Sequence, residues 1–183
     1  ITNAPRMHPT MTESELKNIK QLVFVAGISE RDIDLMLLEE FWSCHEFRKW
    51  FLTRVVGANA EISEFLGAKR SVTGSVGESD LEVSFRLSNS QMVMLLIENK
   101  ITANFQRDQA GRYRQRGKAY IETGKCTVYF TILLAPQAYL GTDRSAKGFD
   151  VHISYEDLVN WFEDATHLAD RRLYKRRLLL NAI

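Results

Sequence analysis

The sequence predicts an α/β fold in which helices cover the faces of a mixed β-sheet. Two nearly continuous apolar runs, residues 92–101 and 126–134, have the length and the β-branched and aromatic content of buried strands. Between them, residues 106–123 carry apolar side chains at helical spacing and stop before Gly124, a residue type that often closes helices. A strand, a helix and a strand in this order are typical of a right-handed crossover between parallel strands.

Length and composition favour one globular domain. The chain has 183 residues, of which 45% are hydrophobic and 26% are charged, as in ordinary folded proteins. We expect residues 12–183 to form this domain, and residues 1–11 to be a disordered leader or an expression remnant.

The cysteine content and the lengths of the apolar runs favour a location in the cytoplasm. Cys44 and Cys126 are too few for a disulfide framework, which favours a reducing environment. The longest uninterrupted apolar run, residues 92–97, is far too short to span a bilayer, and the first ten residues lack the apolar core of a signal peptide. We therefore expect a cytoplasmic protein without a membrane partner.

The charge pattern points to local basic surfaces only. The formal net charge is +1, so the whole molecule has no strong attraction to a polyanion. Residues 107–118 and 171–177 are locally basic. Each segment is either a contact for nucleic acid or a partner, or a solvated helix face.

Capping-box patterns predict two helix starts in the N-terminal third of the chain. TESE from Thr12 predicts a short helix, and SERD from Ser29 predicts a longer amphipathic helix over about 30–55 that Gly57 ends. The apolar stripe of the longer helix comprises Ile33, Leu37, Cys44, Phe47 and Phe51.

An acidic residue, Glu40, interrupts this stripe. A carboxylate is costly to bury unless it is paired or protonated, so Glu40 is a candidate functional residue. Its neighbour Glu39 falls beside the stripe. The alternative is that Glu40 lies at the edge of the stripe and reaches water past Phe41.

Alternating residues predict a hairpin in the middle of the chain. Apolar side chains alternate with polar ones over 81–87, SNS at 88–90 is a turn sequence, and the apolar run from Met92 follows. Before the hairpin, residues 57–79 are weakly periodic, with a short strand expected around 68–72.

Further helices are expected near the C-terminus. Ser154 and Asp157 form another capping pattern, ahead of apolar residues at helical spacing. The tail from about residue 168, rich in Leu and Arg, is also predicted to be helical.

The end of the buried strand carries a pair of charged residues suited to chemistry. Glu98 and Lys100 are two positions apart, so on a strand both side chains point to one face. A carboxylate can hold a hard divalent cation, and an ammonium group can stabilise a developing negative charge. The alternative is an ordinary ion pair at the surface of the sheet.

A second carboxylate is expected beside this pair. Asp80 opens the first strand of the hairpin, level with the end of the second, so Asp80 and Glu98 can converge on one cation. Strict alternation places Asp80 on the polar face together with Glu82. We therefore expect a twist or a bulge within residues 77–80.

These residues resemble a known family. GESDLEV, LLIENKI and QAGRY are similar to motifs of the PD-(D/E)XK nuclease superfamily, and the resemblance covers roughly residues 30–135. It implies a restriction-endonuclease-like α/β/α sandwich with a central mixed β-sheet flanked by helices. Ser79 stands where the proline of the family name would be.

The resemblance also implies site residues. Asp80, Glu98 and the backbone carbonyl of Asn99 would bind Mg²⁺ or Mn²⁺, and Lys100 would position water or stabilise the transition state. The resemblance further implies Glu40 as an acid on the first core helix. Gln109 and Tyr113 would orient the metal ligands or contact the phosphate backbone, and Arg112 and Arg116 would contact phosphates.

The implied activity is metal-dependent hydrolysis of phosphodiester bonds, with DNA as the expected substrate. A homodimer, or membership of a larger defence or repair assembly of bacterial type, is compatible with this expectation. The alternative is a catalytically inactive domain of the same fold that binds nucleic acid or a protein partner. The presence of Asp80, Glu98 and Lys100 favours the active enzyme, because an inactive domain has no chemical need to keep all three.

Overall fold

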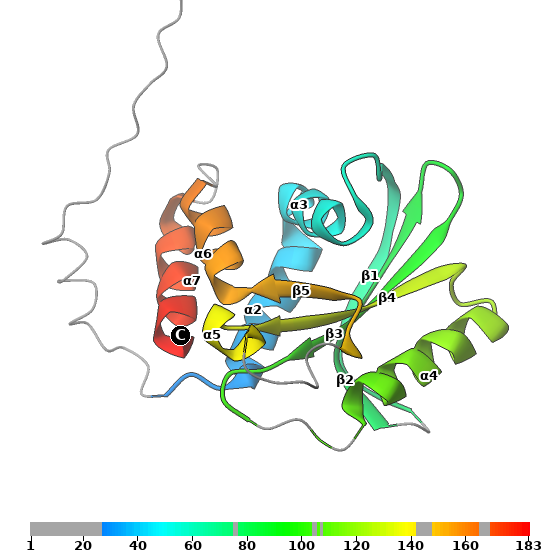
Figure 1. Cartoon of the computed structure of the whole chain (residues 1–183). Helices are drawn as coiled ribbons and strands as arrows, with labels where there is room; N and C mark the ends of the chain where they lie inside the picture. Colours follow the sequence, from blue (N-terminus) through cyan, green and yellow to red (C-terminus); the bar gives the residue numbers. More distant parts are fainter. Residues whose placement is uncertain (1–26, 75–76, 104–105, 107, 142–147, 165–168) are drawn as a thin grey trace, which may run out of the picture.

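One five-stranded mixed sheet forms the centre of the protein (Figure 1). The computed structural model describes residues 27–74, 77–103, 106, 108–141, 148–164 and 169–183. The strands lie side by side in chain order, antiparallel from β1 to β3 and parallel from β3 to β5. Their bounds are β1 Ile62–Gly74, β2 Gly77–Leu87, β3 Met92–Asn99, β4 Val128–Ala135 and β5 Val151–Ser154.

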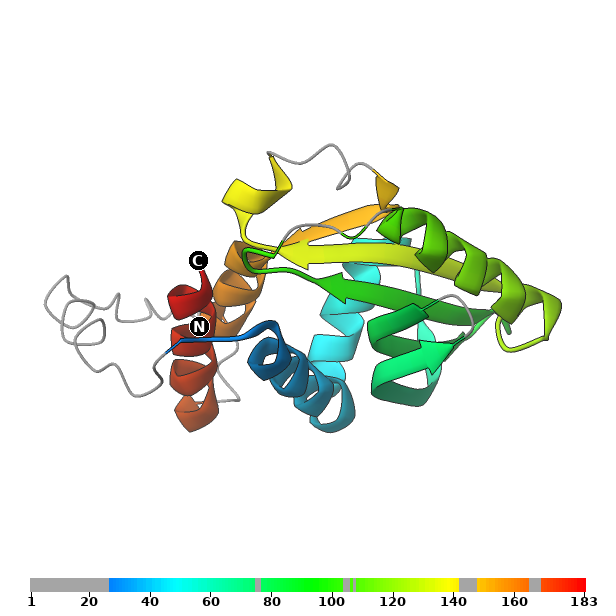
Figure 2. The same cartoon turned by 90° about the horizontal axis from the view of Figure 1, so that it is seen from below.

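Helices cover both faces of this sheet, as Figure 2 shows, with α4 on one side and α2 and α3 on the other. α6 and α7 pack against each other, and α7 also contacts α2. The α/β class with a mixed sheet flanked by helices is thus confirmed. The helix bounds are α2 Glu30–Ser43, α3 His45–Val56, α4 Gln109–Glu122, α5 Gln137–Leu140, α6 Tyr155–Asp164 and α7 Ala169–Ala182.

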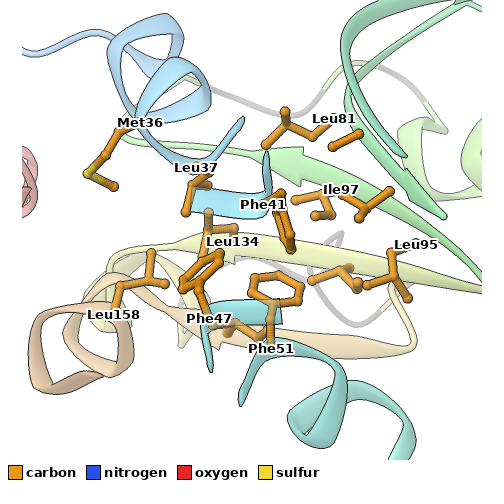
Figure 3. Close-up of a cluster of buried hydrophobic side chains, with 14 of the residues drawn as sticks. Met36, Leu37, Phe41, Phe47, Phe51, Leu81, Leu95, Ile97, Leu134 and Leu158 are labelled. Carbon is orange, nitrogen blue, oxygen red and sulfur yellow. The ribbon is translucent and has the colours of Figure 1, made fainter. Parts of the chain in front are cut away.

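Alternation along the strands assigns each side chain to one of two cores. The odd-numbered residues from Leu81 to Leu87 and from Val93 to Ile97 enter the larger core beneath α2 and α3. There Phe41, Phe47 and Phe51 pack edge to face or tilted (Figure 3). The even-numbered residues face α4, where a smaller core includes Leu96 and Tyr113. The functional consequence is that Glu98 and Lys100 lie under α4, whereas Asn99 between them points toward α2.

Several helix boundaries follow the local signals in the sequence. The amide of Ser29 donates to Oδ2 of Asp32 at 2.9 Å, and Ser154 and Asp157 exchange the same kind of bond at 3.0 Å. Gly57 and Gly124, both with positive φ, follow the ends of α3 and α4. The helix expected from Thr12 lies outside the described residues.

Other predictions of the elements were wrong in part. The helix expected over 30–55 is two helices, because the backbone of Cys44 is extended and its sulfur accepts a hydrogen bond from the amide of Phe47 at 3.4 Å, which starts α3 anew. The strand expected near 68–72 is the long edge strand β1. The sequence did not predict β5 or α5, which are only four residues each.

The parallel pairing of β3 with β4 around α4 confirms the expected crossover connection. Gly117 permits a close approach there, because a Cβ at this position would lie 2.2 Å from the ring of Tyr129 on β4. Within the described ranges, no helix is both long enough and apolar enough to cross a bilayer.

Candidate active site

The structure brings Asp80, Glu98 and Lys100 together at one end of the β2–β3 hairpin. Leu81 pairs with Ile97, so the next position along each strand places Asp80 opposite Glu98 on the α4 face. All three line a hollow of about 270 Å³ between α2, β1 and the start of α4. Its other lining residues include Glu30, Arg70, Glu78, Gln106, Gln109 and Arg112.

Asp80 and Glu98 are neighbouring carboxylates that are largely shielded from solvent. Glu98 is 1% exposed, and Asp80 is partly buried. Burial, and then the negative charge of Glu98, raise the pKa of Asp80 to about 7, although the amide of Asn99 donates to its Oδ2 at 2.8 Å. The carboxylate form of Asp80 is therefore disfavoured near neutral pH unless a cation lies beside it.

Lys100 is the cation of this cluster. Its Nζ lies 2.7 Å from Oε1 of Glu98. Burial disfavours its charged form, but the charges of Glu98 and Glu30 outweigh this cost and raise the pKa of Lys100 above its usual value. Lys100 is thus an ammonium donor at neutral pH, not a general base.

The oxygen donors of this site fit a hard divalent cation. Two carboxylates that repel each other under burial are the ligand chemistry that Mg²⁺ and Mn²⁺ prefer. No cluster of three or more His, Cys, Asp or Glu side chains suited to a metal ion occurs in the part of the chain that the structure describes. The donor set is therefore a pair of carboxylates that water or a phosphate would complete.

The bulge expected within residues 77–80 is not present. The pairing of β1 with β2 keeps one register from Gly67 opposite Ser84 to Gly74 opposite Gly77, and its two irregularities lie between Ile62 and Gly67. No bulge is needed, because the polar face of β2 is buried. On this face, Glu82 accepts hydrogen bonds from Tyr120 of α4 at 3.0 and 3.1 Å.

Tyr113 does not lie where a phosphate could contact it. It is 3% exposed, and its hydroxyl donates to Oε2 of Glu98 at 2.6 Å and accepts from the amide of Asp80 at 3.2 Å. A phosphate contact of Tyr113 is not supported, because α4 turns this residue inward onto the sheet, and the alternative that Tyr113 orients the metal ligands stays a prediction. Tyr113 instead links the two carboxylate-bearing strands.

Arg116 is likewise turned inward. Its guanidinium donates to the carbonyl of Val72 at 3.0 Å, to the carbonyl of Gly77 and to the hydroxyl of Ser79. These bonds hold the β1–β2 hairpin against α4, so Arg116 is not available to grip a phosphate. Glu82, 3.4 Å away, balances its charge.

Two other residues of α4 do reach the hollow. Gln109, at the start of the helix, accepts from the amide of Gln106 at 3.1 Å, and Arg112 donates to the side chain of Gln106 at 2.8 Å. Both side chains line the hollow beside Asp80.

Glu40 is buried, as its place in the stripe indicated, but the structure does not bring it to this site. It forms an ion pair with Lys175 of α7, and Arg171 lies 3.6 Å away. Its catalytic assignment is not supported, because the end of α2 that faces the hollow is the opposite one. Glu39, half exposed, pairs with the same two cations.

The acids of α2 nearest to the site are Glu30 and Asp34, which sequence reasoning missed. The side chain of Glu30 lines the hollow and accepts from the amide of Ile101 at 3.0 Å. Asp34 is buried, which raises its pKa to about 6, and it accepts from Asn99 at 2.9 Å. Their spacing of four residues, directly after a capping box, was the available signal.

The basic tail is largely engaged within the protein. Lys175 and Arg171 pair with acids of α2, and Arg176 lies 3.3 Å from Glu163 of α6. These contacts favour a role in holding the helices together over a role in docking a partner.

Comparison with known proteins gives a significant match to a family model. No curated protein and no solved structure shows significant similarity to the chain. A family model described as the PD-(D/E)XK nuclease superfamily matches residues 56–180. The match extends past residue 135 through β5 and the C-terminal helices, and it leaves out α2. It covers about two thirds of the chain, and the chain therefore belongs to the PD-(D/E)XK nuclease superfamily.

Proposed function

We propose that the protein is a metal-dependent nuclease that hydrolyses phosphodiester bonds, with DNA as its substrate. The observation that supports this most is the convergence of Asp80, Glu98 and Lys100 in one polar hollow. The chain belongs to a superfamily of nucleases, and hydrolysis of a phosphodiester bond has a use for each of these three groups. Gln109 and Arg112 also line the hollow next to the acids.

Each residue of the site has a separate role in the proposed reaction. Asp80, Glu98 and the carbonyl of Asn99 would hold Mg²⁺ or Mn²⁺, which supplies an activated water at neutral pH and offsets charge on the phosphate. Lys100, oriented by Glu98 and charged, donates to a phosphate oxygen as negative charge develops. Arg112 and Gln109 orient the nucleic-acid backbone at the rim of the hollow.

The test is a cleavage assay with Lys100→Ala. Supercoiled and linear DNA, single-stranded DNA and RNA are incubated with Mg²⁺, Mn²⁺ or EDTA, and products are resolved on gels. We expect cleavage of DNA only with a metal, and a rate for Lys100→Ala lower by at least about 100-fold, because a positioned charge at the transition state is lost. Lys49→Ala, an exposed lysine on α3, is the control and should cut normally.

Two results would contradict the proposal. The first is the absence of cleavage of every substrate in either metal, and the second is equal cleavage by the wild-type protein and Lys100→Ala. Metal-independent binding of nucleic acid without cleavage would instead favour an inactive binding domain.

Tyr113→Phe tests how Glu98 is held. The variant loses the hydroxyl that donates to Glu98 and accepts from the amide of Asp80, while the ring keeps its edge contact with Phe149. We expect the metal concentration for half-maximal cleavage to rise about 10-fold, within the range for groups that orient metal ligands. Tyr120→Phe, on the same helix as Tyr113, removes a hydroxyl bonded to Glu82 of β2 and should leave this metal concentration unchanged. Equal effects of the two variants would refute a specific role for Tyr113.

A further inference from the structure

The middle residue of the Glu98–Lys100 segment, Asn99, is fully buried. Alternation turns its side chain away from the hollow and toward α2. There Nδ2 donates both of its hydrogens, to the carbonyl of Glu30 and to Oδ1 of Asp34, each at 2.9 Å. Oδ1 accepts from the hydroxyl of Tyr155 at 2.6 Å. One amide side chain thus joins the end of β3 to the first turns of α2 and of α6.

The backbone of Asn99 completes this connection on the other side. Its amide donates to Oδ2 of Asp80 at 2.8 Å, which is a bond to a side chain where the ladder with β2 has already ended. The last paired residues of that ladder are Leu81 and Ile97, so the three residues that follow Ile97 have no strand partner on the β2 side. On the other side, β4 pairs with Asn99 and the amide of Lys100.

A strand end with a ladder on one side only can pivot about that ladder. Glu98 and Lys100 are carried by this end, and they need a fixed separation from Asp80 to share a cation or to contact a phosphate. The three bonds of the Asn99 side chain lie on the face opposite to the hollow and oppose such a pivot. Because Asn99, Asp34 and Tyr155 are buried, loss of one of them leaves a polar atom of another unsatisfied.

We propose that Asn99, anchored by Asp34 and Tyr155, is a positioning residue that fixes the end of β3 and so sets the geometry of Glu98 and Lys100 relative to Asp80. The proposal rests on the proposed function for its catalytic consequence. Asn99 acts through its neighbours: its side chain touches neither the hollow nor a substrate.

Two variants test the anchor, each with two measurements. Tyr155→Phe removes only the hydroxyl that Asn99 accepts from, and Asn99→Leu removes all three side-chain bonds while keeping the same branching and number of side-chain heavy atoms. Tyr120→Phe is the control, since it removes a hydroxyl bonded to a carboxylate on the α4 face. The first measurement is hydrogen exchange of the backbone amides of residues 98–101 in metal-free protein. The second is the dissociation constant for Mn²⁺, from calorimetry or electron paramagnetic resonance.

We expect the exchange of these amides to be at least about 10-fold faster in both variants than in Tyr120→Phe at matched global stability. The Mn²⁺ dissociation constant should rise about 10-fold in Tyr155→Phe and more in Asn99→Leu. In the cleavage assay, the metal requirement should rise in the same order, while the rate at saturating Mn²⁺ changes less, because Lys100 is retained.

The two proposals fail in different ways. Unchanged exchange in a folded Tyr155→Phe and Asn99→Leu overturns the anchor, whatever the activity. Faster exchange in both variants supports the anchor even if the wild-type protein binds no Mn²⁺, a result that would overturn the proposed metal site alone. Faster exchange with an unchanged Mn²⁺ affinity overturns the positioning role. If Asn99→Leu does not fold, Tyr155→Phe decides by the same criteria.

Discussion

Replacing Asp80 with asparagine is expected to make the metal-free protein more stable at pH 8 and to abolish the stabilisation that Mn²⁺ would give at the proposed site. The expected gain in the free energy of unfolding is on the order of 4 kcal/mol at most, since a pKa raised from 3.8 to about 7 corresponds to roughly three units at about 1.4 kcal/mol each. The physical cause is that the wild-type fold holds a buried carboxylate next to Glu98, and an amide of the same shape carries no charge.

The pH dependence follows from the sign of this shift. Between pH 3.8 and about 7, the folded protein keeps a proton on Asp80 that the unfolded chain has released. The stability of the metal-free wild-type protein therefore falls as the pH rises through this interval and is constant above it. Asp34, with its pKa raised to about 6, acts in the same direction. Stabilisation by Mn²⁺ should grow over the same interval, because the metal replaces the proton.

Urea unfolding from pH 5 to 8, with EDTA or with Mn²⁺, checks both parts of this prediction. Asp164→Asn, an exposed aspartate at the end of α6, is the control and should change little under either condition. An Asp80→Asn protein that is less stable than the wild type at pH 8 in EDTA would contradict the raised pKa of Asp80. One that Mn²⁺ still stabilises would show that the two carboxylates do not share a cation.

Lys175→Met is expected to destabilise the protein by about 3–5 kcal/mol, the usual cost of removing one partner from a buried ion pair. Glu40 is fully buried and Lys175 is 2% exposed, so the substitution leaves a carboxylate in the interior with Arg171 at 3.6 Å as its nearest remaining cation. Adding Glu40→Leu should recover most of the loss, because two apolar side chains of similar volume then fill the site.

A double-mutant cycle in urea measures this coupling. Arg54→Met is the control, because Arg54 and Asp157 form an ion pair between α3 and α6 at 2.9 Å that is much more exposed, and its removal should cost under about 1 kcal/mol. Glu40→Gln should keep the wild-type affinity for Mn²⁺. A large loss of that affinity with an intact fold would restore Glu40 to the active site, against its position in the structure.

The sequence predicted those parts of the site that depend on local spacing. Two-residue alternation placed Glu98 and Lys100 on one face, and the hairpin turn at 88–90 brought Asp80 level with them. Residue types and turn signals within about 20 positions are sufficient for this, because the register of a short hairpin is set by its turn.

The errors arose where the partner of a residue lies far away in the chain. Periodicity correctly placed Glu40 inside, but nothing near it indicates that Lys175, 135 positions later, is its counter-charge. In the same way, the residue types near Tyr113 and Arg116 did not show that both side chains are turned inward and bonded to strands far away in the chain. The break at Cys44 replaces one long helix by two, and helical periodicity alone did not mark it.

The absence of α2 from the family match has a practical consequence for defining the folding unit. A fragment that starts at residue 56 would contain Asp80, Glu98 and Lys100, yet it would lack Phe41, Phe47 and Phe51 of the larger core. It would also expose the apolar side of β2 and β3 and remove both partners of Asn99 on α2. The shortest piece of this chain that can be studied by itself therefore begins no later than the Ser29 cap, whatever limits the family comparison suggests.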